Sequence, residues 1–143
     1  MTKLTLHFIL GISIFLMTTS CQHQEKKEIK TSASNYLQAL LNDDFATAIH
    51  FADDETRNFI AFLAKLDEYS GQQSKKEKVA SINITNINIT NDSLATVSFV
   101  AHFADNTRNE DILNMKKVNH QWVAHHTKEG FSPYTPNNIT DLV

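Results

Sequence analysis

The sequence predicts an α+β domain in which three helices precede an antiparallel sheet of four strands. Between residues 36 and 66, apolar side chains recur every three or four positions, as on the buried face of a helix. From Val79 onward, apolar and polar side chains alternate, which is typical of strands with one buried face. A run of helices before a run of strands favours helices packed on one face of an antiparallel sheet.

The first 21 residues have the order of a bacterial lipoprotein signal. A cationic start with Lys3 precedes an apolar run at positions 4–17, and small residues then lead to Cys21, the only cysteine. This run is shorter than the roughly 20 residues that a membrane-spanning helix needs. Its length is that of a secretory signal core. We therefore expect residues 1–20 to be a cleaved signal peptide and Cys21 to be lipidated, with palmitate among its acyl chains.

Other interpretations of Cys21 stay open. Cleavage near Ser20 by the ordinary route would leave a free thiol, and the cysteine could be incidental. Thr18 also stands where a strict lipobox has leucine. The looser lipoboxes of Bacteroidota lipoproteins resemble this N-terminus. A lone thiol outside the cytoplasm is open to oxidation, and acylation removes that liability. The residue after the cysteine is Gln22 and not Asp, which by analogy with proteobacterial sorting favours the outer membrane. Residues 22–25 are only weakly acidic, whereas surface display in Bacteroidota tends to need acidic residues there, so we expect the protein to face the periplasm.

The remaining chain divides into three parts. Residues 21–30 are polar apart from Cys21 and Ile29, and are predicted to be the lipidated cysteine and a tether. Residues 31–128 carry the periodic patterns and are predicted to be the folded domain. Residues 129–143 contain both prolines and little pattern, which indicates a C-terminal tail.

Three helices are expected within positions 31–71. Ser and Thr at positions 31–34 offer N-caps for a first helix, which ends at the Asn-Asp-Asp of positions 42–44. A second, shorter helix covers positions 45–52. A third begins at an N-cap formed by Asp54 or Thr56 and ends at Ser70-Gly71. Its apolar face consists of Phe59, Phe62, Leu63 and Leu66.

Four strands are expected after Val79. The pair Ile87 and Ile89 is out of phase with Ile82 and Ile84, so either residues 85–86 hold a bulge or the strand changes faces there. After a turn at 91–93, residues 94–103 form the clearest strand. Two further strands are predicted at 112–118 and 122–126, joined by a turn at 119–120.

Three segments resemble nuclear-transport-factor-2-like domains. Positions 36–48 read YLQALLNDDFATA, and in that family an aliphatic pair, an acidic break and Phe-x-x-Ala join two helices. Positions 91–99, NDSLATVSF, resemble the central hairpin, and positions 116–123, KKVNHQWV, resemble the closing hairpin. The similarity spans residues 31–128 and extends to small Bacteroidota lipoproteins of unknown function. It implies a cystatin-like cone, in which a curved sheet wraps around a long helix and forms a cup.

The resemblance also implies where an enzyme on this fold would keep its acid or base, namely inside the cup. His126 and Tyr36 are the candidate catalytic residues here, although a core residue with satisfied hydrogen bonds is the commoner role. His125 and His126 are neighbours on a predicted strand and should point to opposite faces, so they cannot chelate one metal together. His102 is predicted to face solvent.

Other patterns point to structure. The acidic residues at 53–55 suit helix capping. The stripe of Phe59, Phe62 and Leu66 with two strand phenylalanines is expected in the core, with an apolar ligand pocket as the alternative. No metal spacing, nucleophile motif or glycine-rich phosphate loop is present, so we expect no metal and no cofactor.

These observations favour a non-catalytic binding or interaction module attached to the membrane through Cys21. Its ligand would be a protein, a glycan or a small apolar molecule, and a homodimer is a further expectation. The formal net charge of −3 leaves no basic field for nucleic acid. An isomerase- or dehydratase-like enzyme is the alternative, followed by an inhibitor of an envelope hydrolase. Several such inhibitors rely on disulfides, which one cysteine cannot form.

Overall fold

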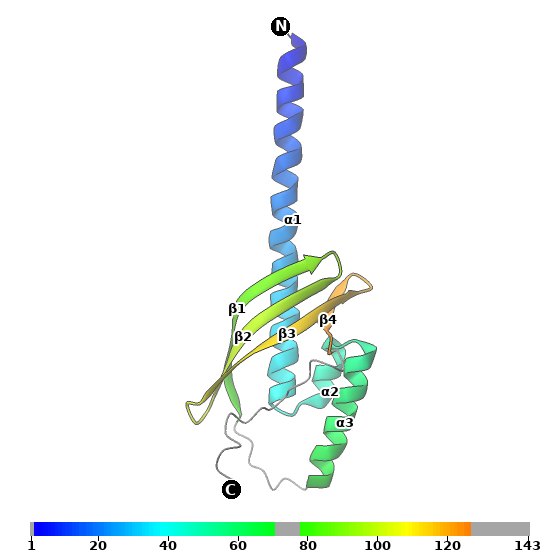
Figure 1. Ribbon diagram of the computed structural model, residues 1–143, viewed down its shortest axis with the longest axis vertical. Helices are drawn as coiled ribbons and strands as arrows, with labels where there is room; N and C mark the ends of the chain where they lie inside the picture. The colour runs from blue at the N-terminus through cyan, green and yellow to red at the C-terminus, as the bar shows by residue number, and fades with distance from the viewer. Residues whose placement is uncertain (1, 71–77, 127–143) are drawn as a thin grey trace, which may run out of the picture.

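A computed structural model describes residues 2–70 and 78–126 of the chain, with the side chains of residues 22–69 and 78–126. It confirms the α+β class and the predicted order of helices and strands (Figure 1). The predicted tail at 129–143 lies outside the described residues. The elements are α1 (Thr2–Leu41), α2 (Phe45–Ala48), the 3-10 helix η1 (Ile49–Phe51), α3 (Asp54–Ser70), β1 (Val79–Asn91), β2 (Leu94–Phe103), β3 (Arg108–Val118) and β4 (Gln121–Ala124).

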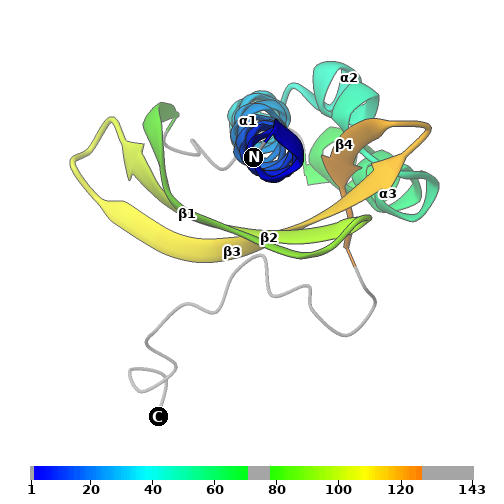
Figure 2. The same cartoon turned by 90° about the horizontal axis from the view of Figure 1, so that it is seen from above.

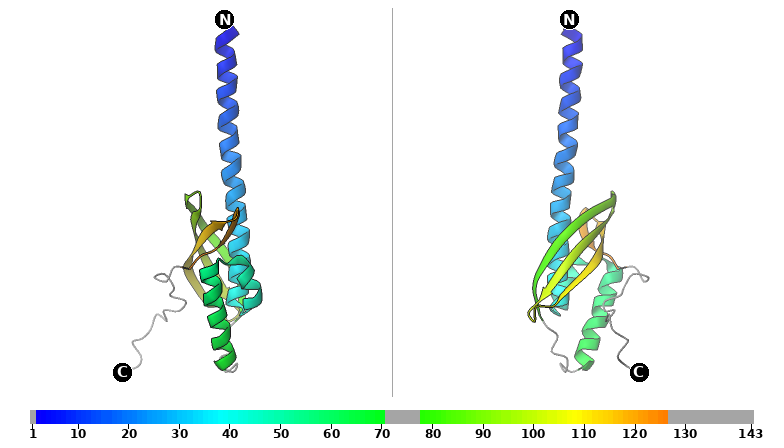
Figure 3. Two further views of the ribbon diagram at one scale, coloured as in Figure 1. Left: turned by 90° about the vertical axis from the view of Figure 1, so that its right-hand side faces the viewer. Right: turned by 60° about the vertical axis from the view of Figure 1, so that its left-hand side comes forward.

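The four strands form one antiparallel sheet in the order β1-β2-β3-β4. The sheet curves around α1, which lies on its concave side together with the shorter helices (Figure 2). Side views show the strands crossing α1 obliquely (Figure 3). The core fills the space between α1 and the sheet. Its largest fully buried side chains are Tyr36, Ile29, Ile60, Met115, Val97 and Thr56.

Helix α1 is longer than the sequence predicts. The prediction of an N-cap at residues 31–34 is wrong, because α1 is continuous from Thr2 to Leu41. The segment predicted to be a tether is helical, and Ile29 within it is 0% exposed. Ile29, Ala33 and Leu37 are spaced by four residues, so the buried face begins a turn before the predicted start. No helix in the described ranges is both long and apolar enough to span a membrane.

Helix α3 begins where predicted, with a different cap and a different buried face. The cap is Asp53, and neither Asp54 nor Thr56 takes that role: the Thr56 backbone N–H donates to Asp53 Oδ1 at 3.0 Å. The predicted burial of Phe62 and Leu66 is wrong, since they are 55% and 47% exposed. Helix α3 packs mainly against α2 and η1, so only its first turns reach the core, and Ile60 is fully buried there.

The predicted second helix is divided into α2 and η1, and the sheet follows the prediction closely. A register shift between Ile84 and Asn86 confirms the bulge. Strand β3 starts at Arg108, four residues earlier than predicted, and β4 ends at Ala124, two residues earlier. The predicted turn between them is confirmed: Asn119 and His120 have φ values of 49° and 65°, as in tight two-residue hairpins.

Candidate functional site

A polar network lies where the start of α3 meets the end of β4. The Asp53 backbone N–H donates to the Ala124 carbonyl at 3.0 Å, next to a parallel bridge between Ala52 and Ala124. Asp53 Oδ1 also accepts the Thr56 hydroxyl at 2.6 Å. Asp53 and Thr56 are both buried. These contacts with Thr56 and Ala124 position the Asp53 carboxylate independently of any contact with a histidine.

The second Asp53 oxygen binds His125. His125 Nδ1 lies 2.5 Å from Asp53 Oδ2, and both side chains are largely buried, with 16% and 8% exposed. Burial alone would raise the pKa of Asp53. Hydrogen bonds from Thr56 and from His125, together with the His125 charge, hold that pKa below its ordinary value. An ionised Asp53 orients the His125 ring, as carboxylates orient catalytic and metal-binding histidines.

The two predicted catalytic candidates bind each other. The Tyr36 hydroxyl lies 2.7 Å from His126 Nε2, to which it donates while the ring is neutral with its proton on Nδ1. The His126 backbone N–H donates to the Thr56 hydroxyl at 2.9 Å, and its ring packs near Phe59, with centroids 6.2 Å apart. Burial lowers the pKa of His126. Burial, with the Asp53 charge, raises the pKa of Tyr36 above its ordinary value. The pair is therefore held in its neutral form.

The prediction of opposite faces for His125 and His126 is not met, since both rings bind residues of the helical layer. Strand β4 ends at Ala124, so the alternation of the strand no longer governs the next two residues. His102 is exposed, as predicted. The sequence favoured capping over a paired-carboxylate site for the acidic residues at 53–55, and nothing in it linked Asp53 to His125. No cluster of three metal-ligating side chains occurs among the residues that the structure describes.

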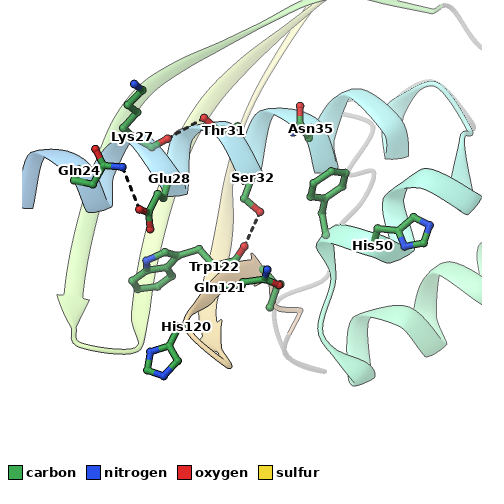
Figure 4. A pocket seen from close by; sticks show the side chains of 12 residues that line it. Gln24, Lys27, Glu28, Thr31, Ser32, Asn35, His50, His120, Gln121 and Trp122 are labelled. Carbon is green, nitrogen blue, oxygen red and sulfur yellow. Dashed lines mark hydrogen bonds between the residues drawn. The ribbon is translucent and has the colours of Figure 1, made fainter.

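A second candidate site is an open groove of about 620 Å³ between α1 and the β3–β4 hairpin. Figure 4 shows Glu28 and Ser32 pointing from α1 toward Trp122, with His120 at the turn below. The Ser32 hydroxyl donates to the Trp122 carbonyl at 2.6 Å, which fastens the hairpin to α1. The groove is lined by Gln24, Lys27, Glu28, Thr31, Ser32, Asn35, His50, Phe51, His120, Gln121, Trp122 and Val123.

Trp122 lines this groove, and a cation lies near its ring. The Lys117 ammonium lies 5.4 Å from the centre of the ring and is itself paired with Glu25 at 2.6 Å. The hydrogen bond to Glu25 raises the pKa of Lys117. Trp122 is only 4% exposed, and its Nε1 has no hydrogen-bond partner in the described part of the protein. A buried donor without a partner costs about 1–3 kcal/mol.

The chain matches no family model and none of the curated proteins. Two solved structures are similar to it. A Campylobacter jejuni protein provisionally described as an NTF2-like transpeptidase aligns with a TM-score of 0.52 and 17% identity, over 66% of this chain and 94% of its own. A SEC-C motif containing protein from Rhodopseudomonas palustris aligns with a TM-score of 0.46 and 17% identity, over 63% and 67%. The first likeness shows that this chain has the nuclear-transport-factor-2-like fold.

Proposed function

We propose that this protein is a bacterial envelope lipoprotein, anchored at Cys21 in the outer membrane and facing the periplasm, that acts as a non-catalytic binding module. The observation that carries the binding role is the groove between α1 and the β3–β4 hairpin. Its volume of about 620 Å³ is within the range typical of ligand sites. Tyr36, in contrast, is fully buried and bound to His126, which disfavours a reaction at that pair.

The anchor rests on the order of the N-terminal residues: a cationic start, an apolar run, small residues and Cys21. Several acyl chains on one cysteine hold a protein firmly at a bilayer, where a single chain does not. Helix α1 joins Cys21 directly to the groove, since Gln24 follows three residues later, about 4.5 Å along the axis. The ligand would therefore bind close to the membrane surface.

The anchor is tested with Cys21→Ser. In the native host, we expect the unchanged protein to incorporate labelled palmitate and to partition into the detergent phase. The variant should lose both properties. Asn88→Ser, at an exposed position of β1, is the control and should behave as the unchanged protein. A variant that kept its membrane association, or an unlabelled parent protein, would contradict lipidation.

The binding role is tested by blocking the groove. Gln121→Trp places a large side chain in its lining, whereas Gln38→Trp places one at an exposed α1 position outside it. Small molecules extracted from the host envelope should raise the Tm of the unchanged protein and of Gln38→Trp, because a ligand stabilises the state that binds it. They should leave the Tm of Gln121→Trp unchanged. An equal change in Tm for the two variants would argue against ligand binding in the groove.

One observation favours a second function, an acid–base enzyme of the isomerase or dehydratase kind. Asp53 orients His125 through Nδ1, which is the arrangement of a histidine base supported by a carboxylate. His125 is therefore a better candidate base than the buried Tyr36–His126 pair. If this function holds, His125→Ala should abolish turnover of a substrate and His102→Ala should not. Turnover that survives His125→Ala would exclude this mechanism.

A further inference from the structure

We propose that the Glu28–Trp122 end of the groove binds a hydroxyl group of a neutral saccharide. This inference rests on the proposed binding role of the groove and adds the chemical class of the ligand. One hydrogen-bond donor of this groove is unpaired among the residues that the structure describes. Trp122 is 4% exposed, and its Nε1–H has no partner in the described part of the chain. A buried donor without a partner is unfavourable in free energy, and a ligand that accepts this hydrogen bond removes that penalty.

A carboxylate supplies the complementary group. Glu28 points from α1 toward the Trp122 ring and lines the same groove (Figure 4). One of its oxygens accepts a hydrogen bond from Gln24 at 3.3 Å, so acceptor capacity remains on the carboxylate. Glu28 is exposed, and its side chain can change rotamer to admit a ligand.

A group that serves both residues must accept from the indole N–H and donate to the carboxylate. A hydroxyl does both. An ammonium group has no lone pair for the indole, and a phosphate or carboxylate would face the charge of Glu28. The Glu28–Trp122 pair therefore selects for a hydroxyl over ionic groups.

The rest of the lining suits a neutral ligand with many hydroxyls. The formal charges of Lys27 and Glu28 cancel, and several neutral side chains can donate, accept or do both. These neutral side chains are Gln24, Thr31, Asn35 and Gln121, and the imidazoles of His50 and His120 line the same groove. Saccharides present alternating donors and acceptors of this kind.

A peptide fits this groove less well. An extended peptide binds a sheet by adding to an edge strand, and β4 is the edge here. The outward carbonyls of that edge are already used: Trp122 O accepts from Ser32 at 2.6 Å, and Ala124 O accepts from the Asp53 N–H at 3.0 Å. Strand addition would have to break these contacts. The observations therefore favour a saccharide.

The test uses the indole N–H itself, because Trp122 is the only tryptophan in the chain. In the ¹⁵N-labelled full chain, held in a polyoxyethylene detergent that carries no sugar, one indole resonance reports on the groove. The probes are chitotriose, cellotriose and mannotriose. We expect at least one of them to shift this resonance saturably. Glu28→Gln should weaken that binding about ten-fold or more, as expected for a lost hydrogen bond to a charged group.

Glu110→Gln is the matched control, because Glu110 is an exposed carboxylate on β3 that pairs with Arg108 and lies outside the groove. It should leave the sugar affinity unchanged. Trp122→Phe provides a second variant and should lose sugar affinity in calorimetry while the fold, followed by circular dichroism, persists. Equal affinities of the Glu28 and Glu110 variants would overturn the proposed contact.

Two further results overturn the inference. In one, no probe shifts the indole resonance, and Glu28→Gln shifts it without ligand. The Glu28 carboxylate would then accept the hydrogen bond of the Trp122 indole N–H itself, either directly or through a water molecule. In the other, envelope extracts still stabilise the protein in a manner that Gln121→Trp abolishes, but no saccharide binds. The groove would then keep its proposed role with a ligand of another class. Failure of both the extracts and the sugars would remove the binding role as well.

Discussion

Asp53 Oδ2 lies 2.5 Å from His125 Nδ1, while Oδ1 of the same carboxylate accepts the backbone and hydroxyl hydrogens of Thr56 at the start of α3. One side chain thus caps a helix and fixes the residue that follows the last strand. The Asp53 backbone N–H adds a third link, to Ala124. Loss of this carboxylate should loosen α3 and the end of β4 together.

Asp53→Ala should lower the free energy of unfolding by about 2–4 kcal/mol, because it removes a helix cap and leaves a buried histidine without its partner. Asp53→Asn keeps a capping side chain and should cost less. Urea unfolding at neutral pH measures both variants. Asp54→Ala is the control: its side chain is 94% exposed and pairs with Arg57, so the expected loss is under about 0.5 kcal/mol. Equal losses for Asp53→Ala and Asp54→Ala would refute the structural role of Asp53.

The lowered pKa of His126 predicts a loss of stability in mild acid. Burial disfavours the protonated ring, so the unfolded chain binds the proton more readily than the folded protein does. The contribution of His126 is therefore complete above its unfolded pKa of about 6.5 and declines as pH falls toward the lower folded value. His126→Gln should flatten this slope in urea titrations between about pH 7 and pH 5. The exposed His102→Gln should retain the slope, and a slope unchanged in His126→Gln would contradict the prediction.

Ile29→Ala should destabilise the domain by about 2–5 kcal/mol, as expected for a fully buried aliphatic side chain. The neighbouring Lys30→Ala changes an exposed residue of the same helical turn and should have little effect. Thermal and urea unfolding of the two variants distinguish a packed helical segment from a loose tether. Similar stabilities for both would mean that residues 22–30 do not belong to the domain.

Helix α3 offers a contrast between two positions that are two residues apart. Ile60 is 0% exposed and Phe62 is 55% exposed, although the sequence pattern predicts Phe62 in the core. Ile60→Ala should therefore cost about 2–5 kcal/mol and Phe62→Ala less than about 1 kcal/mol. Urea unfolding of the two variants measures both losses of stability. A larger loss for Phe62→Ala would show that the apolar face of α3 is covered in solution.

The sheet could be predicted in detail because each strand carries its own signals. The phase change between Ile84 and Ile87 located the bulge, and Asn119-His120 located the hairpin. Both features depend on residues that are neighbours in sequence. The start of α1 within the domain could not be predicted, since one apolar residue, Ile29, stands among charged ones. Its burial depends on a sheet formed much later in the chain.

The candidate sites were predictable only in part, for the same reason. Tyr36 and His126 were correctly selected as chemically interesting, but 90 residues separate them, and no local pattern indicates that they bind each other. Asp53 and His125 are 72 residues apart. The position of Asp53 between two helices is explained by capping, and no local pattern indicates that its carboxylate also binds His125. Trp122 looked like a hairpin residue, and its unpaired N–H becomes visible only in the folded protein.

The continuity of α1 has a mechanical consequence. Eight residues of unbroken helix, about 12 Å, join Cys21 to the buried Ile29. An acyl anchor at Cys21 would therefore be connected to the domain by a rigid helix and not by a flexible tether. The domain would stand at a set height and tilt above the lipid headgroups, with its groove turned toward one thin layer of the periplasm. The domain would then meet ligands only by moving in the plane of the membrane, and ligands outside that layer would have to diffuse into it.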